Sequence, residues 1–147
     1  MKNLNFKKLM SGKHRVEDMA HVGYIDNNEF EVCLYSKEGK HIPHFHVRDK
    51  TTEGQKFETC IKISENRYFH HGSYDDRLNS GQRKALMEFL KSKPVGKYNK
   101  YDTYYELIAA TWEFMNPNSS IELNQDEEGN IIIPDYTEIK EYKDKKQ

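Results

Sequence analysis

Apolar and polar residues alternate along much of the first half of the chain, a pattern typical of β-strands. Residues 20–35 contain two such runs around Asp26-Asn27-Asn28, and these residue types tolerate the positive φ angles of a tight turn. Because Pro43 cannot donate to a sheet, the next strand is expected to begin at His44. The pattern predicts an antiparallel sheet with strands near residues 29–35, 44–48 and 57–63.

The periodicity becomes helical after residue 78. Asn79, with Gln82 three residues later, is a typical N-terminal cap, and Pro94 ends the apolar stripe that follows. A second apolar stripe runs up to Asn116-Pro117. We therefore expect helices near 80–92 and 103–116, packed on one face of the sheet. The expected core residues are Phe45, Ile61, Leu86, Phe89, Leu107 and Trp112.

The last part of the chain predicts one more β-hairpin, which turns at Glu128-Gly129-Asn130. Strands followed by helices and a late hairpin indicate the α+β class, with a sheet of three to five strands. A chain of 147 residues is long enough for one well-buried core, so we expect a single domain over residues 1–147. Its ends, residues 1–12 and 140–147, are expected to be flexible.

The stretch KHIPHFHVRD holds three of the seven histidines. In a strand with a period of two residues, Phe45 and Val47 face the core. His44, His46 and Arg48 then point together to the opposite side. The pattern predicts that these three side chains form an outward, polar surface, in which case replacing His44 and His46 would leave stability nearly unchanged.

Three interpretations of these histidines stay open at this point. They could be the solvent side of an ordinary strand, a binding surface for a protein, nucleic acid or small anion, or a metal site. In the metal interpretation His41, His44 and His46 bind zinc or another divalent transition metal, and a metal-bound water supports hydrolysis. His70 and His71 would complete that site if their loop folded back over the same face.

Composition narrows the choice of partner and location. The net charge of −1, from 23 basic and 24 acidic residues, gives no overall attraction to nucleic acid or membrane. No apolar run approaches the roughly 18 residues of a membrane span, and the N-terminus has no apolar run typical of a signal peptide. With only Cys33 and Cys60, the chain fits a reducing cytoplasm in which both thiols are free.

A nucleic-acid-binding function remains an alternative because basic residues gather in the N-terminal arm. The segment 97–105 adds tyrosines between lysines, which could stack on bases and contact phosphates. The favoured interpretation is that the arm is solvated and the rings pack against the protein. The residues in question are Tyr98, Tyr101, Tyr104 and Tyr105, with Lys97 and Lys100.

Pro43-His44-Phe45-His46-Val47, followed by a strand and a helix, resembles a bacterial family of small domains of unknown function with a Pro-His-Phe-His signature. The likeness spans roughly residues 28–115 and includes four later positions: Arg83, Ala85, Leu86 and Trp112. The resemblance implies a toxin–antitoxin-like gene context and an origin in mobile or phage-related bacterial DNA. The resemblance implies no catalytic residues, and it only singles out His44 and His46 as the residues that the two share in the signature.

The hypothesis that follows is a non-enzymatic, cytoplasmic binding or regulatory module with a protein partner, recognised through His44, His46 and Arg48. The alternatives are a metal-dependent hydrolase using the His41, His44 and His46 cluster, and a nucleic-acid-binding protein. The binding-module hypothesis requires no cofactor, whereas the hydrolase alternative requires zinc or another divalent transition metal. The sequence does not indicate an oligomeric state.

Overall fold

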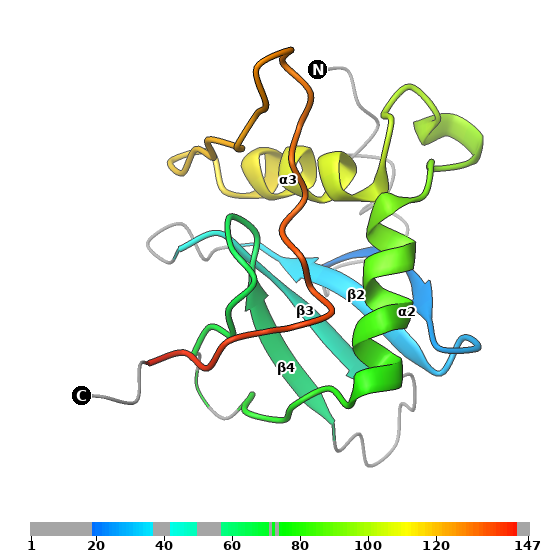
Figure 1. Ribbon diagram of the computed structural model, residues 1–147, viewed down its shortest axis with the longest axis vertical. Coiled ribbons are helices and arrows are strands. Elements are labelled where there is room, and N and C mark those ends of the chain that lie inside the picture. Colours follow the sequence, from blue (N-terminus) through cyan, green and yellow to red (C-terminus); the bar gives the residue numbers. More distant parts are fainter. Residues whose placement is uncertain (1–18, 37–41, 50–56, 71, 73, 144–147) are drawn as a thin grey trace.

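The computed structural model contains a four-stranded antiparallel sheet with two main helices, which confirms the α+β class (Figure 1). The strands follow one another in the order β1-β2-β3-β4, so each pairs with its neighbour in sequence. Their bounds are Met19–Ile25, Phe30–Tyr35, His44–Asp49 and Glu58–Lys62. The structure describes residues 19–36, 42–49, 57–70, 72 and 74–143.

The turn between β1 and β2 lies at the predicted residues. Asp26, Asn27 and Asn28 have φ angles of 57°, 59° and 67°, and the Glu29 amide donates to the Asp26 carbonyl oxygen. Three consecutive residues with positive φ are unfavourable for most side chains, but Asn and Asp are the non-glycine residues that adopt this conformation most readily. The local sequence therefore determines the hairpin.

Helix α2 spans Ser80–Lys91, as predicted, and its start is set by a reciprocal cap. The Asn79 side chain accepts a hydrogen bond from the Gln82 amide, and the Gln82 side chain accepts one from the Asn79 amide. Two otherwise unpaired backbone groups are thus satisfied at the first turn.

Helix α3 spans Tyr104–Met115 and also matches its prediction. The Thr103 hydroxyl caps it by accepting a hydrogen bond from the Glu106 amide. A short 3-10 helix, η2, at Gly96–Tyr98 lies between the two helices. No helix among the described residues has the length and apolar character needed to cross a membrane.

The predicted packing of both helices on one face of the sheet is not confirmed. Figure 1 shows α3 lying across one end of the strands, at a steep angle to α2. The Phe89 ring of α2 lies so close to Gly23 of β1 that a Cβ at Gly23 would be 2.6 Å from it. In α3, by contrast, the Trp112 ring reaches His44, with 5.1 Å between ring centroids. The two helices therefore contact different parts of the sheet.

The predicted core is confirmed for most of its residues. Phe45 and Ile61 are cross-strand partners in β3 and β4, and both are completely buried. Phe89 is only partly buried at the edge of this core. The remaining predicted core residues, all buried, are Leu86, Leu107 and Trp112.

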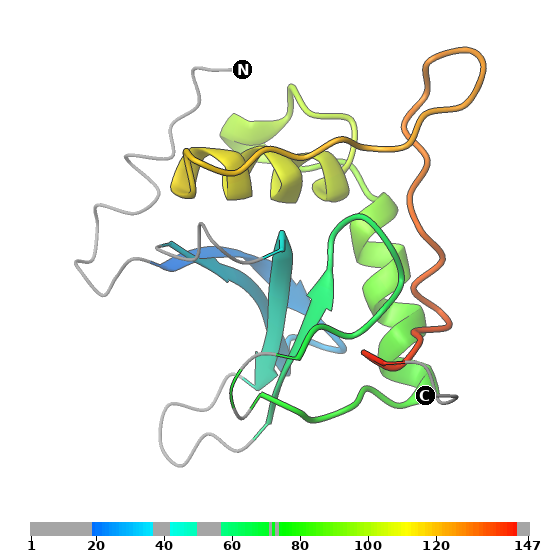
Figure 2. The same ribbon diagram turned by 90° about the vertical axis from the view of Figure 1, so that its left-hand side faces the viewer.

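The late hairpin is not confirmed. The chain does turn at Gly129, where Gln125 and Ile131 form an isolated antiparallel bridge and the Ile132 amide donates to the Asn124 carbonyl oxygen, but these residues belong to no strand. The chain then runs back along α2 (Figure 2). There the Tyr136 hydroxyl is buried and bonds to the carbonyl oxygens of Lys62 and Ile63.

Of the two ends that were predicted to be flexible, the structure describes only residues 140–143. Residues 1–12 and 144–147 lie outside the described residues. Lys140, however, is held on both sides of its backbone: its amide donates to the Asn66 carbonyl oxygen, and its carbonyl oxygen accepts from the Tyr68 amide. The chain is therefore attached to the sheet at least as far as Lys140.

Candidate metal centre

One face of the sheet carries an unusual concentration of ionisable side chains. The strand register aligns His21, Cys33, His46 and Cys60 in a row across all four strands, and cross-strand partners point to the same side. A neighbouring row contains Glu31, Arg48 and Glu58. We call this side the polar face; it comprises His21, Glu31, Cys33, Tyr35, His44, His46, Arg48, Glu58 and Cys60.

The prediction that His44 and His46 face solvent is wrong, because both side chains are completely buried. The alternation of side chains along the strand does place them on the face opposite to Phe45 and Val47. Other segments of the chain, however, cover this polar face. Residues 67–70 and 74–76 run along the outer edge of β4, where Tyr68 bridges Ile61 and Asp75 bridges Thr59. The covering rings are Phe69 and Trp112 near His44, with centroids 4.6 and 5.1 Å away, and Tyr74 near His46, at 5.4 Å.

Arg48, the third residue of the predicted surface, is only partly exposed. Its Nε donates to Glu31 Oε1 over 3.2 Å, and its Nη1 donates to the Tyr35 hydroxyl over 3.3 Å. Glu31 also contacts His21. The guanidinium is therefore held within the polar face and neutralised by Glu31, which leaves little of it available to an external partner.

His44, His46 and Cys60 form the most compact group of metal-binding side chains among the described residues. Each offers one donor atom, and the three donor atoms lie within 4.8 Å of one another. All three side chains are completely buried. Imidazole nitrogen and thiolate sulfur are the donors that zinc and copper prefer.

Hydrogen bonds determine which nitrogen each histidine can offer to a metal. His44 Nδ1 lies 2.7 Å from the Ile42 carbonyl oxygen, which can only accept, so Nδ1 carries the proton. His46 Nδ1 lies 2.8 Å from Glu58 Oε2, and the Tyr35 hydroxyl donates to the same oxygen over 3.2 Å. An oxygen that receives two donors carries no proton itself. When the imidazoles are neutral, Nε2 is the unprotonated nitrogen of each ring and the one that can bind a metal.

The spacing of Cys60 and His46 fits a shared metal ion. Cys60 Sγ lies 3.7 Å from His46 Nε2. Zinc bond lengths of about 2.0 Å to nitrogen and 2.3 Å to sulfur, at a tetrahedral angle, place two such ligands about 3.5 Å apart. Sγ is also 3.4 Å from His46 Nδ1, so the sulfur lies beside the ring, and the two side chains have to reorient for Sγ and Nε2 to share a metal.

The other histidines predicted for the metal site are not joined to this cluster by the described structure. His41 and His71 lie outside the described residues. His70 is exposed, and its ring packs on Tyr142 with 4.6 Å between centroids. Among the described residues, the candidate ligand set is His44, His46 and Cys60.

Sequence reasoning missed Cys60 as a ligand, although a usable signal existed. If Phe45 and Ile61 both face the core as neighbours in an antiparallel pair, then His46 and Cys60 must share the other face. Neither cysteine forms a disulfide, as predicted, and both are buried. Cys33 and Cys60 lie on either side of β3, about 9–10 Å apart by strand spacing, which exceeds the roughly 7 Å limit for a disulfide.

The environment of the polar face controls the charge of its other groups. Burial, followed by the nearby Glu31, raises the pKa of the Cys33 thiol well above its ordinary value, so Cys33 stays protonated. Burial, with Cys33 and Glu58 close by, also raises the pKa of Tyr35. The Tyr35 hydroxyl therefore remains a hydrogen-bond donor to Glu58.

Glu31 gives a prediction about pH. Burial alone would raise its pKa, but His21 and Arg48 outweigh burial and hold the pKa below its ordinary value of 4.5. A group with a lowered folded-state pKa stabilises the fold above its ordinary pKa, and this contribution is lost as the pH falls through the folded-state value. Glu31→Gln should therefore reduce the free energy of unfolding at neutral pH by about 1.5–3 kcal/mol. Relative to the parent protein, that loss should shrink as the pH falls below about 4.5.

Urea unfolding of both proteins at several pH values measures this difference. A difference that stays constant down to about pH 3 would contradict the proposed ionic contact of Glu31 with His21 and Arg48.

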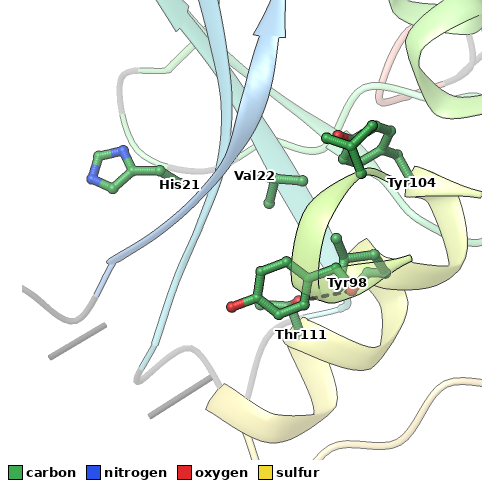
Figure 3. Close-up of a pocket in the computed structure, with 7 residues that line it drawn as sticks. His21, Val22, Tyr98, Tyr104 and Thr111 are labelled. Atoms are coloured by element: carbon green, nitrogen blue, oxygen red, sulfur yellow. Dashed lines mark hydrogen bonds between the residues drawn. The ribbon is translucent and has the colours of Figure 1, made fainter. Parts of the chain in front are cut away.

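A separate cavity of about 190 Å³ lies between β1 and α3. In Figure 3, His21 and Val22 leave β1 on opposite sides, with Val22 toward Tyr98 and Thr111. The cavity is smaller than the roughly 300 Å³ at which pockets for drug-sized ligands begin. It also lacks the three clustered ligands, so the polar face is the stronger candidate site.

The tyrosines of segment 97–105 are largely engaged with the protein. Tyr104 stacks on Phe89 with ring centroids 4.3 Å apart, and Tyr105 is buried and donates to the Ile63 carbonyl oxygen. These two rings are therefore committed to packing rather than to stacking on bases. Nucleic-acid binding through the remaining residues of this segment stays an untested prediction.

No protein family, curated protein or solved structure matches this chain. The resemblance drawn from Pro43-His44-Phe45-His46-Val47 therefore stays a prediction, and function has to be inferred from the geometry of the polar face.

Proposed function

We propose that this protein is a metal-binding domain in which His44, His46 and Cys60 hold zinc or another divalent transition metal. The observation that carries the proposal is the pair of imidazoles anchored through Nδ1, beside a buried thiol, with the three donor atoms within 4.8 Å of one another. Histidines that are oriented through Nδ1 and bind through Nε2 are the usual arrangement around protein-bound zinc.

The burial of the three ligands favours a structural or regulatory role for the metal over turnover of a substrate. A hydrolytic metal must keep an open position that its substrate can reach. Here all three ligand side chains are completely buried, and aromatic rings lie over both histidines. The binding-module hypothesis is therefore retained in a changed form, with the metal stabilising the domain that a protein partner would recognise. In the cytoplasm, the predicted location, Cys60 would remain a reduced thiol able to bind metal.

Metal analysis of the full chain, purified without a histidine tag, tests the proposal. We expect about one metal ion per chain in the parent protein and in Cys33→Ser, and a large loss in Cys60→Ser. Cys33 is a matched control because it is also a buried thiol beside His46, in the same row of the polar face. Absence of metal from the parent protein, even after incubation with Zn²⁺, would contradict the proposal. Equal metal contents in the two variants would also contradict it.

Trp112 provides an independent measurement of binding. It is the only tryptophan of the chain, and its ring lies 5.1 Å from that of His44. Titration of metal-free protein with Zn²⁺ should change its fluorescence and saturate at one equivalent. In the same preparation a chelator should lower the thermal midpoint of the metal-loaded form, because a ligand that binds only the folded state stabilises it.

A further inference from the structure

The end of the described chain is attached to a loop that lies next to the proposed metal ligands. We call residues 135–142 the C-terminal strap and residues 66–70 the covering loop; Figure 1 shows the strap, in orange and red, beside the loop that follows β4. The Lys140 amide donates to the Asn66 carbonyl oxygen over 2.9 Å, and the Tyr68 amide donates to the Lys140 carbonyl oxygen over 2.8 Å. The strap thus pairs with the loop as a short parallel strand would.

Side chains of the covering loop add further hydrogen bonds to the strap. Asn66 Nδ2 donates to the carbonyl oxygens of Asp135 and Glu138, over 3.0 and 2.5 Å. Arg67 Nη1 donates to the Glu141 carbonyl oxygen over 2.8 Å. Each of these acceptors belongs to the backbone of the strap, so the bonds depend on where that backbone lies and are lost together if the strap leaves the loop.

Tyr136 anchors the strap in the core. It is the one completely buried side chain of the strap, and its hydroxyl bonds to the carbonyl oxygens of Lys62 and Ile63 at the end of β4. On the other side, Arg83 of α2 donates from Nε to the Thr137 carbonyl oxygen over 2.8 Å. The strap is therefore held by α2 and β4 together, and it fixes the covering loop to both.

The covering loop in turn lies against two of the proposed ligands. The Phe69 amide donates to the Cys60 carbonyl oxygen over 2.9 Å, and the centroids of the Phe69 and His44 rings are 4.6 Å apart. Trp112 covers His44 from within α3, so opening that side would require a whole helix to move. The covering loop belongs to no helix or strand, and such segments open locally at a lower free energy than regular elements do.

We infer that the C-terminal strap controls the rate at which metal enters and leaves the cluster of His44, His46 and Cys60. This inference rests on the proposed metal-binding function and adds the regulation of that site. While the strap is in place, Phe69 stays over His44. When the strap loosens, the loop can move away and expose the ligands to solvent. None of the contacts described above joins the strap to a ligand directly, so loosening it should speed entry and release alike and leave the affinity nearly unchanged.

Stopped-flow transfer of Zn²⁺ to a chromophoric chelator tests the inference, at chelator concentrations where the rate no longer depends on the chelator. The zinc-loaded proteins are the parent, Asn66→Ala and Asn79→Ala. Asn66→Ala removes two side-chain hydrogen bonds to the strap but no metal ligand. Asn79→Ala is the matched control, because it is the same substitution at another hydrogen-bonded asparagine, whose side chain caps α2 instead of holding the strap.

We expect Asn66→Ala to speed Zn²⁺ release by about tenfold, since the two lost hydrogen bonds together stabilise the closed loop by about that factor. Its equilibrium affinity, measured by competition with the same chelator, should stay within about threefold of the parent value. Asn79→Ala should change the release rate by no more than about twofold. In metal-free protein, hydrogen exchange of the Phe69 amide should become about tenfold faster in Asn66→Ala and stay near the parent rate in Asn79→Ala.

An unchanged release rate in Asn66→Ala would overturn the inference. An equal increase in Asn79→Ala would overturn it too, because release would then follow overall stability. If Asn66→Ala does not fold, Tyr136→Phe decides, since it keeps the ring in the core, removes the hydroxyl bonds that anchor the strap and must speed release by at least about tenfold. A parent protein that binds no Zn²⁺ would instead overturn the proposed function, and exchange of the Phe69 amide would still test the link between strap and loop.

Discussion

Replacing Trp112 with alanine should lower the free energy of unfolding by about 3–5 kcal/mol, a large part of the stability of a domain of this size. The ring is completely buried and belongs to the main hydrophobic core. Its Nε1 donates to the Ser119 hydroxyl over 3.0 Å, and its ring lies beside His44. The substitution thus leaves a cavity where α3 meets the sheet. Urea unfolding followed by circular dichroism measures the loss.

Val95→Ala is a suitable control for the Trp112 variant, since Val95 is 73% exposed and its truncation should change stability by no more than about 0.5 kcal/mol. Ser119→Ala separates the hydrogen bond from the packing, because it removes the partner of the indole nitrogen and leaves the ring in place. A loss below about 1 kcal/mol for Trp112→Ala would contradict the packing of α3 described above.

The elements that the sequence predicts well are those with local causes. The turn at Asp26-Asn27-Asn28 depends on residues that tolerate positive φ, and the start of α2 depends on the cap formed by Asn79 and Gln82. Both signals lie within a few residues of the structure they determine. Alternation within β3 is equally local, which is why the opposite orientations of Phe45 and His46 could be predicted.

The burial of the histidines could not be predicted in the same way, because it depends on distant segments. Phe69 and Trp112 cover His44 from positions 25 and 68 residues further along the chain. A strand with one apolar and one polar side is usually exposed on the polar side, and nothing near His44 indicates otherwise. The chain that follows the predicted late hairpin is held by a long-range contact as well, because the buried hydroxyl of Tyr136 bonds to the end of β4.

The candidate site was therefore predicted only in part. His44 and His46 were identified by their spacing, but the third ligand depends on strand register. Cys60 lies opposite His46 only because β3 and β4 pair with Phe45 beside Ile61. A shift of one residue would turn Cys60 to the other face. Sequence spacing between His46 and Cys60 carries no such information.

His46→Ala should destabilise the protein by about 3–5 kcal/mol, even when a chelator is present to remove any metal. This expectation reverses the one that follows from an outward-facing histidine, for which the loss would be no more than about 0.5 kcal/mol. The reason is the contact between His46 Nδ1 and Glu58 Oε2, at 2.8 Å. Both side chains are buried, so removing the imidazole leaves a carboxylate that has lost one of its hydrogen-bond partners in a site with little access to water.

Three further variants make the His46 prediction specific. His70→Ala also removes an imidazole, but from an exposed position against Tyr142, and should change stability by no more than about 0.5 kcal/mol. Glu58→Met in the His46→Ala background removes the stranded charge, so the double variant should lose less stability than the sum of the two single variants. Urea unfolding in the presence of the chelator gives all four values. Additive losses, or a loss below about 1 kcal/mol for His46→Ala, would show that water reaches Glu58 and that the polar face is open rather than closed.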